Sequence, residues 1–321
     1  MNLLAKKNDL DNHFSQLIRK YEVIAPIKKE DIIAFNPISS FEDIYLDEQS
    51  TYSFKKYILP NKEKLFSFKN KKPVKEEPDI PERILCMCSC DANALLNIDR
   101  IYLDENPDEM YRRRRENTYI FVFKCKKPGE NCFCSSVSTL DPLAYDVLFI
   151  DIGNQYILIP GTKKGMELVK NKRFAPIIRD GRIVFECERK AENLDRLETH
   201  MDDPEWKKAA DTCINCNACI TVCPTCMCFD IRDELNVDEK SGDRVRYWDY
   251  CHMKDFTKVA GGFVFRENKI NRFRHRILHK LRYFKERQGR HLCVGCGRCI
   301  NICPAGIDIL KIIDNLGKND K

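Results

Sequence analysis

Glycine is scarce in this chain, with 13 among 321 residues. The glycine-rich loops that bind dinucleotides or phosphates therefore have little material from which to form, and GTKKG (161–165) lacks the spacing and the Ser or Thr of a P-loop. No apolar run approaches the ~18 residues that a transmembrane helix needs. The opening MNLLAKKNDLDN contains no apolar core, so it predicts no secretory signal and a cytoplasmic protein without a membrane span.

Catalytic signatures are also missing. The chain has six histidines, and two of them, His275 and His279, are spaced i, i+4 without the glutamate of a zinc-protease HExxH motif. We expect both to be exposed residues of a charged helix. No Ser–His–Asp signature is present. These absences predict a protein that is not a catalyst in its own right.

Charge and apolar content are those of a globular protein. Lys and Arg number 55 against 49 Asp and Glu, which gives a net charge of +6, and hydrophobic residues make up 43%. The length suits two or three domains. We expect an N-terminal α/β segment at 1–80, a mixed α/β region at 81–202 and a C-terminal domain at 203–321. The fold class expected for the N-terminal region is α+β or α/β.

Apolar periodicity predicts the elements of that region. Helices are expected at 3–20, 91–103, 165–172 and 189–201, and strands at 21–27, 31–35, 83–90, 118–125, 145–153, 156–161 and 182–187. Asp91 is the expected N-cap of the second helix. Residues 69–82, rich in charge and proline, predict a linker or a long surface loop.

Cysteine is abundant, with 18 residues placed unevenly. None precedes Cys86, six lie between Cys86 and Cys134, Cys187 stands apart, and eleven lie between Cys213 and Cys303. A disulfide-rich secreted protein would be short and would carry a signal peptide. In a reducing compartment, this number of thiols indicates metal binding instead.

Two segments share the spacing C-x2-C-x2-C-x3-C-P. They are CINCNACITVCP and CVGCGRCINICP. In two-cluster ferredoxins, three such thiolates bind one [4Fe–4S] cluster and the fourth binds the other. The predicted ligands are Cys213, Cys216, Cys219 and Cys303 for cluster one, and Cys293, Cys296, Cys299 and Cys223 for cluster two. The alternative is zinc, which needs four ligands and has no use for the third cysteine or the proline. We therefore expect a bacterial-type two-[4Fe–4S] ferredoxin-like domain with a long insertion between its motifs.

A second group of cysteines predicts a candidate third Fe–S cluster. Its members, Cys90, Cys125, Cys132 and Cys134, follow apparent strands, and strand ends are where open α/β sheets hold ligands. Four buried free thiols are the plain alternative, and zinc is another. The spacing assigns no role to Cys226, Cys228 and Cys251. Two alternatives stay open: they complete a site, or they only pack beside the first motif. Cys86, Cys88 and Cys187 are expected in the core.

A basic helix is predicted at 268–289, inside the insertion. Residues 269–290 contain nine Lys or Arg and one acidic residue, Glu286. The charge suits a solvated face. It also suits a surface that compensates the negative clusters or docks an acidic partner. Nucleic-acid binding is a remote alternative, because no recognised motif accompanies the charge.

Several segments resemble one protein family. CPTCMCFDIRDE, RVRYWDYCHMKDFTKVAGG, RFRHRILHK and CVGCGRCINICPAGIDI are similar to the iron–sulfur electron-transfer protein shared by anaerobic sulfite reductases and by soluble sulfhydrogenases, where it is the beta subunit. CDANALLNIDRIYL and CKKPGENCFC extend the resemblance to residues 83–316, and the positions of the third group of cysteines fit the family pattern. Two positions depart from it: CMCS precedes Cys90, where relatives have an Arg-containing segment, and Phe263 follows AGG, where a His is common.

The resemblance implies electron transfer in an anaerobic oxidoreductase complex. A flavoprotein subunit with FAD and a [2Fe–2S] centre would oxidise NAD(P)H, and this chain would pass the electrons onward. CDANALL and HKLRYFKERQGRHLCVGCGRC are closer to the sulfite reductase member, so a sirohaem subunit that reduces sulfite to sulfide is the expected acceptor. The alternative is the beta subunit of a sulfhydrogenase, with Ni–Fe hydrogenase subunits as the acceptor.

Overall fold

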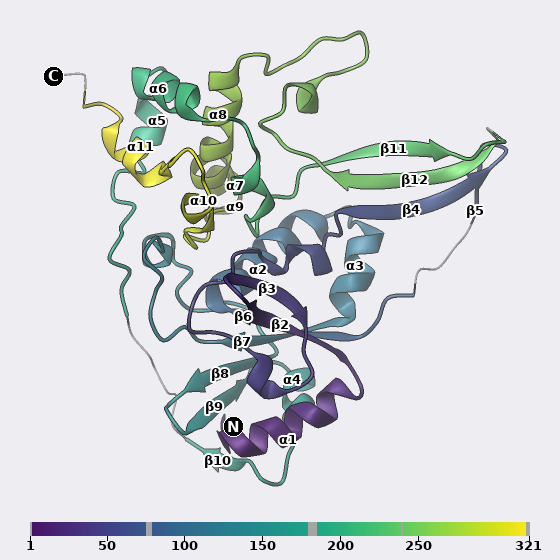
Figure 1. The fold of residues 1–321 in the computed structure, drawn as a ribbon, viewed down its shortest axis with the longest axis vertical. Helices are drawn as coiled ribbons and strands as arrows, with labels where there is room; N and C mark the ends of the chain where they lie inside the picture. Colours follow the sequence, from purple (N-terminus) through teal and green to yellow (C-terminus); the bar gives the residue numbers. More distant parts are fainter. Residues whose placement is uncertain (1, 75–78, 179–184, 239, 319–321) are drawn as a thin grey trace.

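An eight-stranded mixed sheet forms the centre of the larger half of the molecule (Figure 1). The computed structural model describes residues 2–74, 79–178, 185–238 and 240–318. The sheet order is β10-β1-β9-β8-β7-β6-β2-β3. Its strands are β1 (Asn2–Lys6), β2 (Glu22–Lys29), β3 (Ile32–Pro37), β6 (Arg83–Cys88), β7 (Thr118–Phe123), β8 (Val147–Asp151), β9 (Gln155–Pro160) and β10 (Ala175–Ile177). It therefore takes strands from both of the first two segments expected from the sequence.

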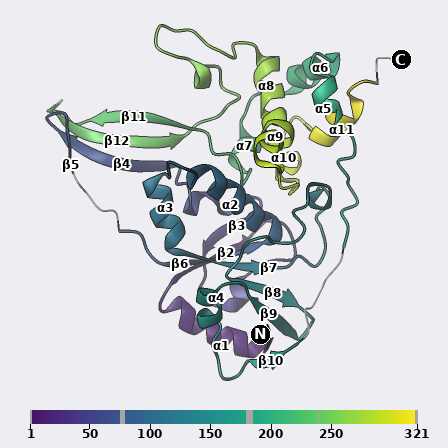
Figure 2. The same cartoon turned by 180° about the vertical axis from the view of Figure 1, so that it is seen from behind.

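Helices cover both faces of this sheet. The four central strands β2, β6, β7 and β8 run parallel, and β6 and β7 are buried on both faces, as their continuous apolar sequence requires. On one face pack α1 (Lys7–Ile18) and α4 (Lys163–Leu168). On the other pack α2 (Ser89–Tyr102) and α3 (Glu109–Glu116), which separate the sheet from the rest of the molecule (Figure 2).

A second, four-stranded sheet projects as an arm (Figures 1 and 2). Its strands are β4 (Lys62–Lys69), β5 (Lys72–Val74), β11 (Phe229–Leu235) and β12 (Ser241–Trp248), in the order β11-β12-β4-β5. The arm joins the N-terminal part to the segment between the cysteine motifs, because β12 pairs antiparallel with β4.

The C-terminal part is helical and has its own apolar core. Trp206, Phe273, Ile277 and Leu310 are among the buried residues that pack together there. The helices are α5 (Arg196–Thr199), α6 (Pro204–Thr212), α7 (Ala218–Thr221), α8 (Lys269–Leu278), α9 (Phe284–Gln288), α10 (Arg298–Asn301) and α11 (Ile309–Asn315). A π-helical turn, His279–Tyr283, joins α8 to α9. The described residues contain no helix long and apolar enough to span a membrane.

Short 3-10 turns complete the described structure. They are η1 (Phe41–Asp43), η2 (Phe54–Tyr57), η3 (Cys134–Val137) and η4 (Lys254–Thr257).

The structure corrects five local expectations. Residues 3–6 of the helix expected at 3–20 form β1 instead, because they pair with β9. Asp91 is not the N-cap of α2, which begins at Ser89 after Cys88; Asp91 lies in the first turn instead. The helix expected at 189–201 is reduced to the single turn of α5. Within the expected linker at 69–82, residues 72–74 form β5, because they pair with β4 across a tight turn; 75–78 lie outside the described residues. The strand expected at 182–187 lies partly outside them, and 185–187 form no strand.

Candidate metal centres

One cavity is lined by the first three cysteines of the first ferredoxin-type motif and by the last cysteine of the second motif. These four are Cys213, Cys216, Cys219 and Cys303, and Cys299 also lines the cavity. Cys213 directly follows α6, and Cys219 lies in α7. Between them, Asn215 and Asn217 adopt left-handed backbone conformations (φ 55° and 62°), which turn the loop around the cavity.

A second cavity is lined by the other four motif cysteines, Cys223, Cys293, Cys296 and Cys299. Here Gly295 and Gly297 occupy the left-handed positions (φ 63° and 73°) that Asn215 and Asn217 occupy in the first motif. Asparagine would not fit, because a Cβ on Gly295 would lie 2.6 Å from the carbonyl carbon of Phe133, and one on Gly297 would lie 2.4 Å from the oxygen of Asn131. The glycines therefore let the second motif pack against residues 131–134.

Arg276 of α8 lies where these two cavities meet. It lines both of them, as does Cys299. Its Nη2 donates a 3.2 Å hydrogen bond to the carbonyl oxygen of Cys219. Burial opposes the charge of Arg276, but its interactions with the surrounding cysteines, above all Cys219 and Cys299, together raise its pKa well above the usual value. A buried cation held by sulfur suits a site that carries negative charge.

Two buried nitrogen atoms test whether the first cavity fits an iron–sulfur cluster. Arg276 Nε and His252 Nε2 belong to residues that line it, and neither has a hydrogen-bond partner in the described structure. Burial, followed by Arg276, lowers the pKa of His252 to about 3, so its ring is neutral. Buried polar atoms without partners indicate an absent hydrogen-bonding group. Four thiols beside such atoms fit a cluster whose sulfur atoms accept hydrogen bonds.

The second cavity has a cation of its own. Lys280 is buried, and its Nζ donates a 2.8 Å hydrogen bond to Thr225 Oγ1. Burial opposes the charge of Lys280, but its interaction with Cys223, followed by that with Cys226, raises its pKa. A hydrogen bond from Cys226 lowers the pKa of Cys223 well below its usual value, and Lys280 acts in the same direction against burial. Cys223 is thereby favoured as a thiolate, the form that binds metal.

The four cysteines of the candidate third site also come together. Cys90, Cys125, Cys132 and Cys134 line one cavity at the end of β6 and β7. Two further cysteines join them. Cys88 lines the same cavity and donates a hydrogen bond to Cys125, whose pKa it lowers, and the Sγ atom of Cys187 lies 3.4 Å from that of Cys134.

The expectation that Cys86, Cys88 and Cys187 are core residues is confirmed for Cys86 and Cys187, which are buried, and Cys88 is partly buried and packs against the core. Cys88 and Cys187 also contact cysteines of the candidate third site, which the sequence did not predict. Sequence reasoning missed them because an apolar strand such as RILCMC does not show which of its ends meets a distant loop.

Shared cysteines place the three cavities in a row. Cys296 lines the third and the second, and Cys299 lines the second and the first. At the end of this row, Cys216 is exposed, unlike the other seven motif cysteines. The row thus reaches the surface at the first motif.

Cys226, Cys228 and Cys251 form a buried group beside the first motif. Cys226 contacts Cys223, and Cys228 contacts Cys251 through a side-chain hydrogen bond. Within the described ranges, no group of three or more His, Cys, Asp or Glu side chains converges on a point that one metal ion could occupy.

The expectation of exposed histidines at 275 and 279 is wrong. Burial lowers the pKa of His275 to about 4 and that of His279 to about 3. Both line a surface groove on α8 and the π-helical turn.

Comparison with known proteins identifies the domain that contains the two motifs. Residues 212–307 match the model of a 4Fe-4S dicluster domain, which includes both motifs. Over 319 residues, the chain is 30% identical to sulfhydrogenase 2 subunit beta of Pyrococcus furiosus, covering 94% of each protein. This relative fits the sulfhydrogenase alternative better than the expected sulfite reductase. The chain belongs to the family of iron–sulfur electron-transfer subunits that includes the sulfhydrogenase beta subunit, and its dicluster domain carries two [4Fe–4S] clusters.

Proposed function

We propose that this chain is the electron-relay subunit of a sulfhydrogenase-type complex. It would receive electrons from a subunit that oxidises NAD(P)H with FAD and a [2Fe–2S] centre, and deliver them to Ni–Fe hydrogenase subunits. The observation that carries the proposal is the row of three cysteine-lined cavities, joined by Cys296 and Cys299. The name of the relative at 30% identity supports the hydrogenase branch.

The proposed cluster ligands are cysteines that line the two cavities of the dicluster domain. Cys213, Cys216, Cys219 and Cys303 would hold cluster one, and Cys223, Cys293, Cys296 and Cys299 would hold cluster two. Each cluster supplies storage for a single electron when bound. Arg276 contributes positive charge to both sites and Lys280 to the second, which favours the more negative, reduced state of each.

A third cluster at Cys90, Cys125, Cys132 and Cys134 is part of the proposal. Cys125 is the one of these thiols whose pKa is lowered, through the hydrogen bond from Cys88. Nearby, Arg298 and Asp91 form a buried ion pair that abuts Cys90 and Cys296. The two charges of this pair neutralise each other. The thiols therefore lie beside fixed polar groups that carry no net charge.

The chain would relay electrons without catalysing a reaction of its own. A hydride carries two electrons, so a flavin must divide them before single electrons reach a [4Fe–4S] cluster. The sequence of this chain contains no recognised nucleotide loop. Flavin and terminal metal chemistry would therefore belong to partner subunits.

The test begins with the anaerobically purified, cluster-loaded chain. Dithionite should reduce it, as seen by EPR, while NADH should leave it oxidised until a flavoprotein partner is added. Oxidation of NADH by the chain, in a preparation free of flavin, would refute the relay role.

Affinity purification from the native host would identify the acceptor. Nickel in the purified complex would support the hydrogenase branch. Sirohaem in its place would refute that branch and favour a sulfite reductase complex.

A further inference from the structure

The segment between β12 and α8 presents apolar side chains to solvent beside the first motif. Met253, Val259, Phe263 and Phe265 are 45%, 46%, 62% and 69% exposed, and we call these four residues the apolar loop face. The rings of Phe263 and Phe265 pack edge to face at 5.1 Å. Large exposed apolar side chains gathered on one loop mark an interaction site.

This loop is attached to the motif that reaches the surface. Asn217 Nδ2 donates a 3.2 Å hydrogen bond to Met253 Sδ, and Asn217 directly follows the exposed ligand Cys216. Ile214, on the other side of Cys216, is 65% exposed. A protein that covered the apolar loop face would therefore lie close to the exposed edge of cluster one.

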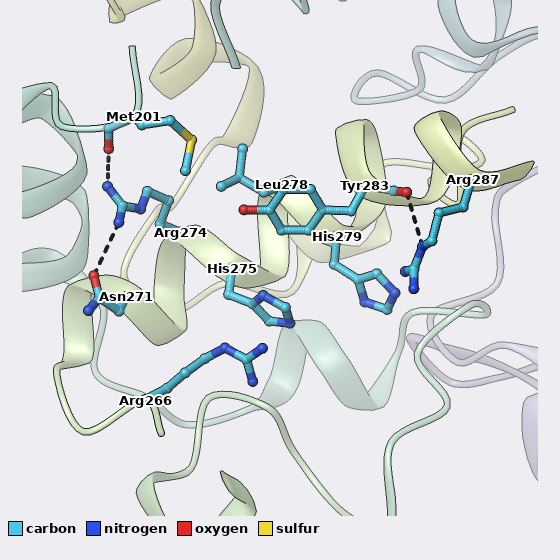
Figure 3. Close-up of a pocket in the computed structure, with 9 residues that line it drawn as sticks. All are labelled: Met201, Arg266, Asn271, Arg274, His275, Leu278, His279, Tyr283 and Arg287. Atoms are coloured by element: carbon cyan, nitrogen blue, oxygen red, sulfur yellow. Dashed lines mark hydrogen bonds between the residues drawn. The ribbon is translucent and has the colours of Figure 1, made fainter. Parts of the chain in front are cut away.

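A basic groove of about 620 Å³ continues from the end of the loop. We define the basic groove by Arg266, Arg274, His275, His279 and Arg287. Figure 3 shows His275, His279 and Arg287 pointing from the helix into the space that Arg266 enters from the loop. No carboxylate lines it among the described residues. Besides burial, Arg266 and Arg287 lower the pKa of His275, which shows that their positive charges act on the groove.

The basic helix thus presents cationic side chains on two faces. Arg276 and Lys280 point inward to the cluster cavities. Arg287 lines the groove instead, and Arg274, which also lines it, pairs with Asp202. The thiols already balance the inward charges, whereas Arg266 and Arg287 offer their charges in the groove to a ligand from outside.

We propose that the apolar loop face and the basic groove together dock an acidic redox protein. Its contact surface would have an apolar centre, which covers Phe263 and Phe265, and carboxylates at its rim, which enter the groove. Such an apolar core with a polar rim is the usual anatomy of a protein interface. The inference rests on the proposed relay function and names cluster one as the point where electrons cross to that partner.

Binding of an acidic probe tests the proposal. The probe is an oxidised plant-type [2Fe–2S] ferredoxin, titrated anaerobically into the cluster-loaded chain in a calorimeter at low and high salt. The charge variant combines Arg266→Glu with Arg287→Glu, and the apolar variant combines Phe263→Ser with Phe265→Ser. The control combines Arg19→Glu with Lys172→Glu, two exposed positions near α1 and α4 at the far end of the molecule.

We expect the charge variant to bind about tenfold more weakly at low salt. The apolar variant should bind more weakly at both salt concentrations, and the control should match the wild-type chain. Equal loss in the control, or no binding of ferredoxin to the wild-type chain, would overturn the docking proposal. Dithionite reduction of the clusters, followed by EPR in every variant, separates that failure from a failure of the relay. A fluorescent single-stranded DNA that binds the wild-type chain tightly and the charge variant weakly would also overturn it, in favour of nucleic acid.

Discussion

Arg298 and Asp91 form two 2.7 Å hydrogen bonds between guanidinium and carboxylate, and their side chains are 2% and 1% exposed. Arg298 lies inside the second cysteine motif, and Asp91 lies in the first turn of α2. Arg298 also donates hydrogen bonds to Ser50 Oγ and to the backbone oxygen of Ser50. The pair therefore joins the dicluster domain to the N-terminal sheet.

Replacing Asp91 should strongly destabilise this junction. Asp91→Ala leaves the buried Arg298 charge without its carboxylate, a loss of about 3–5 kcal/mol in the free energy of unfolding. Anaerobic urea denaturation of the cluster-loaded protein measures the change. Asp211→Ala is a control, because Asp211 pairs with Lys207 at the surface. An Asp91 variant as stable as the Asp211 variant would contradict the prediction.

Cys223→Ser should damage cluster two, although Cys223 belongs to the first motif in the sequence. The reason is that Cys223 lines the second cavity, with Cys293, Cys296 and Cys299. EPR of the reduced protein, compared with Cys213→Ser, distinguishes the two clusters, because Cys213 lines the first cavity. Loss of the signal that Cys213→Ser also removes, with the other signal intact, would show that each motif holds its own cluster.

A cluster bound at the candidate third site should raise the iron content of the protein. Three [4Fe–4S] clusters give ~12 iron atoms per chain, against ~8 for two. Cys132→Ser should therefore lower the iron content of a fully loaded preparation by about 4 atoms per chain, as measured by iron and sulfide analysis. Cys86→Ser is the matched control, because Cys86 packs in the apolar core. Eight iron atoms in both the wild-type chain and the Cys132 variant would refute a third cluster.

Gly295→Ala should disrupt cluster two while the equivalent change in the first motif does not disrupt cluster one. Gly295 has a φ of 63° and an added Cβ would meet the backbone of Phe133 at 2.6 Å, so strain and overlap add. We expect the free energy of unfolding to fall by ~1–3 kcal/mol. Asn215→Ala introduces the same side chain at the equivalent left-handed position without replacing a glycine. Anaerobic thermal unfolding and EPR should show the larger loss for Gly295→Ala.

Features that depend on local spacing could be predicted from the sequence. Two C-x2-C-x2-C-x3-C-P segments predicted two [4Fe–4S] clusters, and the dicluster match confirms that prediction. Continuous apolar runs such as TYIFVF predicted central strands correctly, because burial on both faces of a parallel sheet leaves no place for polar residues. These features need no knowledge of distant residues.

Tertiary structure decided what depends on contacts between distant residues. Only in the fold do Cys88 and Cys187 join Cys125 and Cys134, and only there does Arg276 come to lie between two cavities. A helix with charge on every side does not reveal which residues face inward, since long cationic side chains can be buried when thiolates balance them. The inward and outward roles of the basic helix therefore followed from packing.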